Sequence, residues 1–385
     1  KIIQLVLEMQ LIYFSINKQS IKLFLEEETN NKSFCYLITS EKNKDVRTMI
    51  LNFFKILVKN LNIFEELLEA SGELNVSYFP KKLWGHSTQL IAQVGEELGY
   101  IVEPMPKFIN FEKCQSCGKC VNGCLFDAKW DATYFVREAV EYGAELVTEF
   151  NVFEVLHENN EVIGVVGINK NNEKIVYKAK KVVLAAGALN TPIILKNSEI
   201  KNVGGQIFFD IFTTIGGYLK DANLKNELMM GIKAEFGPYF LSPHYSMQLL
   251  PLMKEKGIKA NESDVIGIML KFADTCIGTI DNTGNIEKTL TKVDADLIKE
   301  GYVKAVKILL NLGVDERSIV ATSLKGAHPG GTAAVGEVVD NNFETEIKGL
   351  YVSDASVIPE APGRPPILTI VAIAKKVAKI VNNNI

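Results

Sequence analysis

The stretch from Gly326 to Ile370, near the end of the chain, constrains the fold most strongly. It opens with a glycine-rich turn around His328, and such a backbone lets a histidine come close to a ligand. The short apolar run Leu350–Val352 predicts a strand. Asp354 follows it directly, at the end of a strand where α/β sheets bind cofactors. We therefore expect one ligand to touch both the turn and the strand end.

The same stretch ends with two prolines, Pro365 and Pro366, which precede a run typical of a helix. Proline is favoured at the first helical position because its missing N–H would be unpaired there anyway. The first N–H groups of such a helix point outward and can hold an anion or an electron-rich ring edge. The turn, the strand end and the helix start are thus predicted to meet at a single ligand.

A second strand-to-turn unit lies earlier in the chain. The run from Val182 to Ala188 has the pattern of a buried strand that continues into a turn of glycine and alanine, and Thr191-Pro192 is typical of a helix start. A turn made of glycine and alanine lets the backbone approach a dinucleotide. The alternative interpretation is an ordinary strand-to-helix turn without a ligand.

The most specific metal signal is the spacing Cys114-x-x-Cys117-x-x-Cys120-x-x-x-Cys124. Four thiolates at this spacing suit a [4Fe–4S] cluster, as in bacterial ferredoxins. Two features depart from the ferredoxin pattern, because Leu125 stands where ferredoxins have proline and no second cysteine set is present. A structural zinc site and a set of reduced, packed thiols are the alternatives.

The order of these motifs resembles the carboxy-terminal signature of the glucose–methanol–choline (GMC) flavin oxidoreductases. That signature reads His-Pro-x-Gly-Thr, then Val-x-Asp-Ala-Ser-x-x-Pro, then Gly-x-Asn-Pro-x-x-Thr-Ile. The turn after Val182 is similar to the Ala-Gly-Ala/Ser-x-x-(Ser/Thr)-Pro segment of the family. The resemblance runs from about Pro104 to the end of the chain, and it covers the preceding residues poorly.

The resemblance implies FAD as the cofactor. It implies that Asp354 contacts the ribityl–phosphate region of FAD and that Val152 meets the adenine through its backbone. The residues implied to bind FAD are Val152, Ala186, Gly187, Ala188, Asp354, Ala355, Pro366 and Ile367.

The resemblance also implies that His328 is the catalytic base, and the alternative is a turn histidine that only hydrogen-bonds the backbone. Alcohol oxidation needs a base for the hydroxyl proton while a hydride leaves the carbon for the flavin, and a neutral imidazole suits the first task. Pro365 stands where the family has a second catalytic Asn or His, and proline offers no donor. The adjacent Arg364 is the candidate that supplies a charge to substrate or flavin. The other histidines, His86, His157 and His244, are expected to be surface or packed residues.

One expected FAD motif is missing. Such enzymes normally open with a strand and a Gly-x-Gly-x-x-Gly turn on the pyrophosphate, whereas no glycine precedes Gly72. The chain also begins at Lys1 rather than at methionine. A missing start is the favoured explanation, and a replaced start or an unusual mode of FAD binding are the alternatives.

These motifs together predict an α/β fold with α+β character. We expect a Rossmann-like FAD-binding domain that lacks its first strand-turn-helix, and a substrate domain built on an antiparallel sheet. The predicted organisation is a poorly matched, partly helical region 1–103, a discontinuous FAD-binding domain 104–202 and 322–385 with the cysteine loop 114–124, and a substrate domain 203–321.

Hydrophobic periodicity predicts the individual elements. The predicted helices span 49–70, 88–98, 131–142 and 294–312. The predicted strands span 145–147, 152–156, 162–168, 174–178 and 265–272.

Composition excludes several classes of function. The 385 residues are 47% hydrophobic and 23% charged, which is ordinary for a globular protein. The net charge of −4 gives no basic surface for nucleic acid. The apolar run over 2–16 is too short to span a bilayer, and no small-residue cleavage site follows it. We therefore expect a cytoplasmic protein without a membrane span.

Two classes of function remain. The first is a FAD-dependent dehydrogenase that oxidises a small alcohol or hydroxylated substrate, with electrons leaving through the cluster to an acceptor protein. The second is a truncated or non-catalytic relative, or an iron–sulfur electron-transfer protein without bound FAD.

Overall fold

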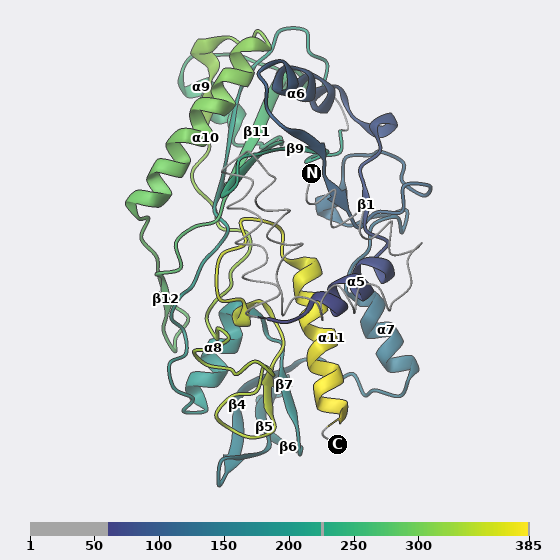
Figure 1. The fold of residues 1–385 in the computed structure, drawn as a ribbon, viewed down its shortest axis with the longest axis vertical. Helices are drawn as coiled ribbons and strands as arrows, with labels where there is room; N and C mark the ends of the chain where they lie inside the picture. The colour runs from purple at the N-terminus through teal and green to yellow at the C-terminus, as the bar shows by residue number, and fades with distance from the viewer. Residues whose placement is uncertain (1–60, 225–226, 384–385) are drawn as a thin grey trace, which may run out of the picture.

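The computed structural model describes residues 61–224 and 227–383, in two lobes along one long axis (Figure 1). The predictions for the apolar run 2–16 and for the first part of the helix 49–70 lie outside these residues. No helix in the described part of the chain is long and apolar enough to cross a bilayer.

The upper lobe is built on one antiparallel sheet, with the strand order β14-β8-β11-β10-β9-β2. Its central strand, β11, is buried at every residue, as expected for a strand covered on both faces. The strands are β2 (Val102–Pro104), β8 (Phe212–Tyr218), β9 (Ile232–Glu235), β10 (Tyr239–Pro243), β11 (Val265–Phe272) and β14 (Val320–Ala321).

Helices cover one face of this sheet. They are α6 (His86–Glu97) and α10 (Lys292–Asn311), with α9 (Leu249–Glu255) at the end of the lobe. Gly301 explains how closely α10 lies on β11, because a Cβ at this position would collide with Leu270. A glycine inside a helix costs about 1 kcal/mol relative to alanine. Gly301 therefore lowers the helix propensity of α10 but allows the helix to pack closely on the sheet.

The lower lobe combines two small sheets with two helices. An antiparallel three-stranded sheet of β4 (Phe150–Glu158), β5 (Glu161–Asn169) and β6 (Lys174–Lys178) lies beside a parallel pair, β7 (Val182–Leu184) and β15 (Leu350–Val352). The parallel register sets Leu350 opposite Val182, so it joins segments far apart in the chain. The helices α8 (Gly187–Asn197) and α11 (Ile367–Asn383) share one buried apolar core with both strands of this pair.

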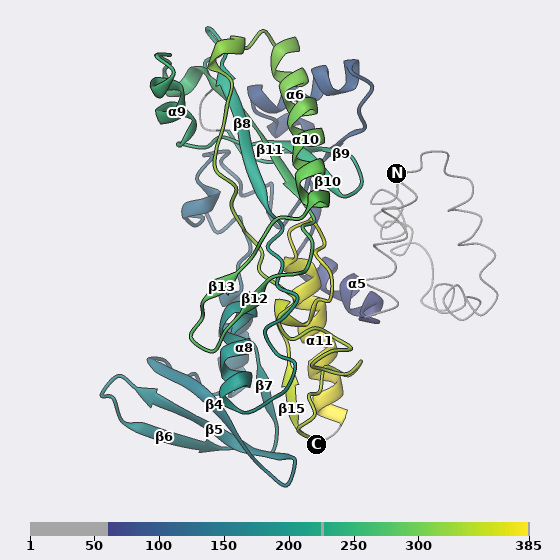
Figure 2. The same cartoon turned by 90° about the vertical axis from the view of Figure 1, so that its left-hand side faces the viewer.

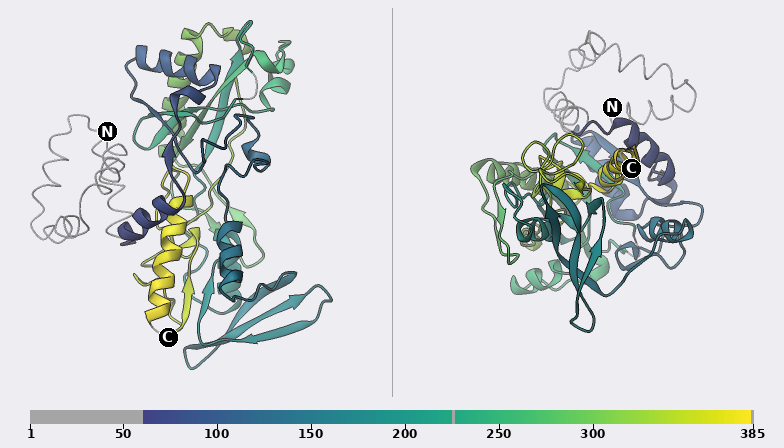
Figure 3. Two further views of the ribbon diagram at one scale, coloured as in Figure 1. Left: turned by 90° about the vertical axis from the view of Figure 1, so that its right-hand side faces the viewer. Right: turned by 90° about the horizontal axis from the view of Figure 1, so that it is seen from below.

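Shorter elements complete the chain. The β12–β13 hairpin lies between the two lobes (Figure 2), and α5 packs against α11 (Figure 3). Ion pairs from Lys375 to Glu73 and from Lys379 to Glu66 reinforce that contact. The remaining elements are α5 (Phe64–Glu73), β1 (Ser77–Tyr78), β3 (Pro106–Lys107), α7 (Thr133–Glu141), β12 (Thr279–Ile280) and β13 (Ile286–Glu287).

The expected fold class is confirmed, with an antiparallel sheet in one lobe and a parallel strand pair between helices in the other. The domain boundaries remain a prediction; β2, from the segment 102–104, joins the sheet of the upper lobe. The strands predicted over 174–178 and 265–272 are confirmed at both ends.

Two local predictions were wrong. Residues 145–147 form no strand, and Leu146 and Val147 are exposed instead. The helix expected to open at Thr191-Pro192 begins at Gly187, so Pro192 lies inside it. A proline inside a helix frees the carbonyl four residues earlier, here that of Ala188. The hydroxyl of Thr332 donates to this carbonyl oxygen at 2.8 Å.

Candidate active site

His328 is held in its turn by backbone and side-chain contacts to one neighbouring segment. Its N–H donates to the carbonyl of Phe209 at 2.9 Å, and its ring Nδ1 lies 3.3 Å from Oδ2 of Asp210. The glycines of the turn are required by this close approach, because a Cβ on Gly330 would collide with the ring of Phe208. The His328 side chain keeps 25% of its surface exposed, whereas that of Asp210 is fully buried. The imidazole is therefore fixed on one side and open on the other.

Asp210 connects the histidine turn to the start of the last helix. Its Oδ1 accepts a hydrogen bond from the Gly363 N–H at 2.7 Å, just before α11 begins. Its backbone carbonyl accepts from Nζ of Lys271, on β11, at 2.5 Å. One buried carboxylate thus holds together the two pieces that the sequence predicted to meet.

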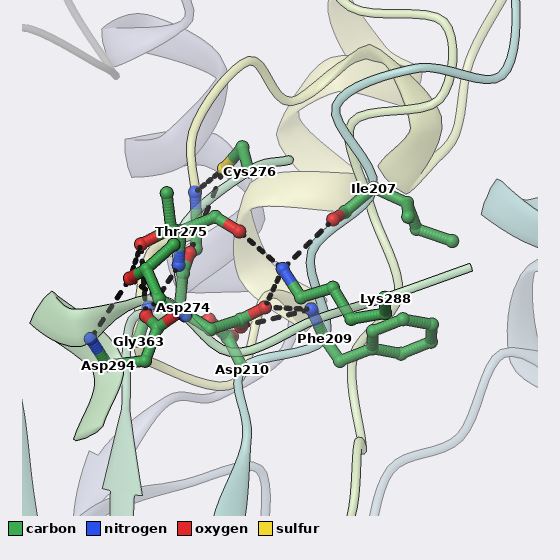
Figure 4. A network of polar contacts seen from close by, with 11 residues as sticks. Ile207, Phe209, Asp210, Asp274, Thr275, Cys276, Lys288, Asp294 and Gly363 are labelled. Atoms are coloured by element: carbon green, nitrogen blue, oxygen red, sulfur yellow. Dashed lines mark hydrogen bonds and ion pairs between the residues drawn. The ribbon is translucent and has the colours of Figure 1, made fainter. Parts of the chain in front are cut away.

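A buried polar network fixes the backbone next to Asp210 (Figure 4). The carboxylate of Asp274 accepts from the Phe209 N–H at 3.1 and 3.2 Å and forms an ion pair with Lys288 at 2.7 Å. Lys288 also donates to the carbonyls of Ile207 and Thr275. The N–H of Thr275 in turn donates to Asp294 in the capping box of α10. The segment that carries Asp210 is therefore anchored to the upper lobe.

Lys271 is a buried cation at this junction. Its side chain is 2% exposed, and burial lowers its pKa to about 8, although Asp210 and Asp274 oppose that shift. Its ammonium lies 6.0 Å from the centre of the Phe212 ring. Alternation along β11 places Lys271 on the same face as Met269, which packs with Met105 in a small apolar cluster. This face of the sheet combines apolar side chains with a buried positive charge.

The predicted cofactor residues of the lower lobe meet at Asp354. Its Oδ2 accepts hydrogen bonds from the Gly187 N–H at 3.0 Å and from the hydroxyl of Thr191 at 2.5 Å, and its Oδ1 accepts from the Ser356 N–H at 2.7 Å. The Ala355 carbonyl accepts from the Gly331 N–H at 3.3 Å, so the strand end also touches the histidine turn. Gly187, Asp354 and Ala355 are thus brought together as predicted from their motifs.

Two features of this cradle suit a bound dinucleotide. Gly187 has a φ of +82°, and the space where a Cβ would stand is open. The hydroxyl of Ser356 is buried and has no hydrogen-bond partner among the described residues. An open backbone approach and an unsatisfied donor are what a phosphate or ribityl group needs. The residues present therefore fit FAD on this side.

The remaining predicted cofactor residues lie around this cradle. Val152 is on β4, which packs against α8. Pro366 is buried and immediately precedes α11. Ile367 is the first residue of α11 and is 40% exposed. Ala188 contributes the carbonyl that Thr332 binds.

Arg364 is fastened to the sheet of the upper lobe. Its guanidinium pairs with Glu235, donates to the carbonyl of Gly237 at 3.0 Å, and lies 5.0 Å from the centre of the Phe240 ring. Burial lowers its pKa to about 10, and the charge of Asp210 opposes that shift. The charge predicted to serve substrate or flavin is therefore largely engaged by protein groups.

The predicted metal site receives no support. No group of three or more His, Cys, Asp or Glu side chains that could hold a metal ion occurs within residues 61–224 and 227–383. Cys114 Sγ lies 3.5 Å from the Ser116 N–H, and Cys124 Sγ lies 3.4 Å from the Ala128 N–H. Burial raises the pKa of the Cys120 thiol, and its cysteine neighbours add to this shift. Two of the four cysteines, Cys114 and Cys124, thus accept local backbone hydrogen bonds.

The other predicted histidines show local contacts. Nδ1 of His244 lies 2.9 Å from the Thr214 hydroxyl, and burial together with Lys325 lowers the pKa of His244 to about 4. Nε2 of His157 lies 3.1 Å from the carbonyl oxygen of Ser198. Both rings are packed, as expected.

Asp210 and Lys271 are functional candidates that the sequence reasoning missed. Each is a lone charged residue inside an apolar run, namely Ile207 to Phe212 for the acid and Val265 to Phe272 for the lysine. A charged side chain in an apolar run is expected to be buried, and a buried charge is either paired or functional. This pattern could have identified both residues from the sequence.

Known proteins similar to this chain agree with this architecture. Two profiles of the GMC oxidoreductase family match residues 42–221 and 286–374. An uncharacterized protein of Methanocaldococcus jannaschii is 38% identical over 282 residues, covering 73% of this chain and 71% of its own length. A long-chain-alcohol oxidase of Arabidopsis thaliana is 26% identical over 373 residues, covering 76% of this chain.

The chain is shorter than several of these relatives. It spans 50% of the Arabidopsis oxidase and 57% of an uncharacterized GMC-type oxidoreductase of Mycobacterium tuberculosis, to which it is 24% identical. Among solved structures, pyridoxine 4-oxidase from Mesorbium loti has a similar fold, with a TM-score of 0.62 at 14% identity over 80% of this chain and 71% of that one. Motifs, fold and family profiles agree, and this chain belongs to the GMC oxidoreductase family.

Proposed function

We propose that this protein is a FAD-dependent oxidoreductase that oxidises the CH–OH group of an alcohol, with His328 as the general base. The observation that carries the proposal is the placement of Asp210, whose carboxylate contacts both the His328 ring and the Gly363 N–H. Family membership implies FAD, and the cradle around Asp354 supports it.

In this proposal FAD, when bound, supplies the hydride acceptor. The backbone at Gly187 and the hydroxyl of Ser356 would hold the cofactor on this side, and the hydrogen bonds of Asp354 fix the backbone of both residues. The first N–H groups of α11, from Ile367, would offer the positive end of a helix dipole to negative charge on the bound cofactor. Pro366 and the backbone of Val152 complete the predicted contacts.

His328 takes the hydroxyl proton of the alcohol. The ring is held through Nδ1 by Asp210, so Nε2 is the nitrogen free to accept that proton. Because Pro365 offers no donor, no side chain at that position orients the alcohol oxygen. Arg364, fixed by Glu235 and backbone carbonyls, holds the turn before α11 and contributes positive charge to this region.

The proposed substrate is an alcohol carried on an apolar molecule. The sheet face that holds Lys271 also carries Met105, Phe240 and Met269, all buried, with Phe212 packed against them. Apolar side chains with a few polar groups among them are typical of sites that bind such molecules and orient them through those groups. The Arabidopsis relative is named as a long-chain-alcohol oxidase, and the solved neighbour as a pyridoxine 4-oxidase.

Electron transfer through a [4Fe–4S] cluster at Cys114, Cys117, Cys120 and Cys124 stays a sequence-based hypothesis. Iron and sulfide analysis after anaerobic purification tests it, and zinc without sulfide would reject it. An acceptor protein and a cytoplasmic location likewise stay predictions.

A visible spectrum of the purified full-length protein tests the proposed function. Bands at about 370 and about 450 nm would show bound flavin. Bleaching of the longer-wavelength band when a medium- or long-chain primary alcohol is added without oxygen would show alcohol oxidation. A colourless protein, or one with only a broad shoulder near about 400 nm, would instead favour the relative without FAD.

A further inference from the structure

We infer that Asp210 is the positioning residue of the site, because it sets which ring nitrogen of His328 carries the proton. The kinetic part of this inference rests on the proposed function. The tautomer itself depends only on the contact between the two side chains, so it can be measured whether or not the protein oxidises an alcohol.

The geometry fixes the direction of the hydrogen bond. Oδ2 of Asp210 lies 3.3 Å from Nδ1 of His328. A carboxylate is only an acceptor, so Nδ1 must be the donor and must carry the ring proton. In the neutral ring Nε2 then has a free lone pair. This is the nitrogen that a base needs, and the ring is partly exposed.

The carboxylate cannot turn away from this contact. Oδ1 is occupied by the N–H of Gly363 at 2.7 Å, and the Asp210 side chain is fully buried. Its backbone has a φ of +49°, a conformation that non-glycine residues seldom adopt. The Lys271 ammonium on the Asp210 carbonyl and the Asp274 carboxylate on the Phe209 N–H hold that conformation from both sides. Each carboxylate oxygen of Asp210 is therefore held against one partner, Oδ1 against the Gly363 N–H and Oδ2 against the His328 ring.

Because these two partners are fixed, the Asp210→Asn substitution tests the inferred tautomer of His328. An asparagine has only one oxygen acceptor, and the buried Gly363 N–H requires it, since an unpaired buried donor is costly. The amide NH₂ group must then face the His328 ring. Nδ1 becomes an acceptor, and the proton moves to Nε2. The variant keeps the shape of the site but presents the wrong tautomer to the alcohol.

Nitrogen-15 NMR of histidine-labelled protein reads the tautomer directly. The chain has four histidines, and comparison with His328→Gln assigns the His328 signals. We expect a protonated Nδ1 in the wild type and a protonated Nε2 in Asp210→Asn, at a pH about two units above the ordinary histidine pKa of about 6.5. The Nε2–H tautomer, or a doubly protonated ring, in the wild type would overturn the inference, and so would an unchanged tautomer in the variant.

Asp274→Asn is the matched control. It removes a buried carboxylate that binds the same segment through the Phe209 N–H, whereas the hydrogen bond described for the His328 ring goes to Asp210. We expect a lower unfolding midpoint and an unchanged tautomer. A tautomer change in this variant would show that general loosening of the segment, rather than Asp210, sets the ring. Should Asp210→Asn fail to fold, the wild-type spectrum still decides the matter.

Kinetics then separate this inference from the proposed function. We expect Asp210→Asn to slow anaerobic flavin reduction at saturating alcohol roughly 100- to 10,000-fold, as loss of a positioned base does, with KM changed less than about threefold. A large rise in KM with an unchanged rate would contradict the positioning role. If NMR shows the tautomer switch but no alcohol reduces the wild type, the pairing holds and the proposed function fails.

Discussion

The hydroxyl of Thr332 donates to the carbonyl oxygen of Ala188 at 2.8 Å, and this is the carbonyl that Pro192 leaves without a helical partner. The side chain of Thr332 is 1% exposed. One residue of the histidine turn thereby completes the first turns of α8. The proline in one motif and the threonine in the other are parts of the same structural arrangement.

Replacing Thr332 should destabilise the protein through this carbonyl. In Thr332→Val the hydroxyl is lost at nearly constant volume, and the buried Ala188 carbonyl has no donor. We expect the free energy of unfolding to fall by about 1–3 kcal/mol, measured by urea denaturation. Thr332→Ser keeps the hydroxyl and should lose clearly less. Equal losses for the two variants would show that the methyl group, rather than the hydrogen bond, matters.

A double-mutant cycle should reveal the coupling with Pro192. Pro192→Ala restores an N–H that can bind the Ala188 carbonyl within the helix. The cost of Thr332→Val should then shrink by about 0.5–1.5 kcal/mol in the Pro192→Ala background. Additive free energies across the cycle would mean that the two residues do not share this acceptor.

His244 should make the protein sensitive to acid. Its pKa is about 4 in the folded state, because of burial and of Lys325, against an ordinary value of 6.5. Between these values the unfolded chain binds the proton and the folded one does not, so stability falls as the pH drops from about 6.5 to about 4. As the pH drops from about 6.5 to about 4, we expect the free energy of unfolding of His244→Gln to fall by roughly 1–3 kcal/mol less than that of the wild type. Parallel stability–pH curves for the two proteins would contradict this.

Arg364 should contribute to stability through its buried pair with Glu235. Arg364→Met leaves that carboxylate, 8% exposed, with Lys233 as its one remaining cationic partner among the residues that the structure describes. We expect a loss of about 3 kcal/mol in the free energy of unfolding. Adding Glu235→Gln should recover part of it, because the excess negative charge is removed while Glu103 still pairs with Lys233. If the double variant is less stable than the single one, the pair is not the reason for the loss.

The sequence predicted the elements whose pattern is local. The apolar run Val265–Phe272 and the run Leu350–Val352 are strands with the predicted ends, since continuous burial leaves a strong signal. The strand predicted over 145–147 from its alternating pattern is absent, because no described strand pairs with this segment and its apolar side chains face solvent. The prediction that a helix starts at Thr191-Pro192 was wrong because Thr332, distant in sequence, donates a hydrogen bond to the Ala188 carbonyl that Pro192 cannot bind.

The candidate site shows the same limit. His328, Gly187 and Asp354 could be predicted from motifs, and the structure places Gly187 beside Asp354. Asp210 could not be predicted as a partner of His328, because the contact joins segments more than a hundred residues apart. The cysteine spacing was specific as a pattern, yet spacing alone does not bring sulfur atoms together, and the described residues show no such group.

Stopped-flow measurement of flavin reduction by an alcohol, without oxygen, in the wild type and in His328→Gln tests the role of His328 most directly. We expect both proteins to bind FAD and the flavin of the variant to be reduced at least about 100-fold more slowly. Reduction of His328→Gln at the wild-type rate would show that His328 is not the base and would contradict the proposed mechanism.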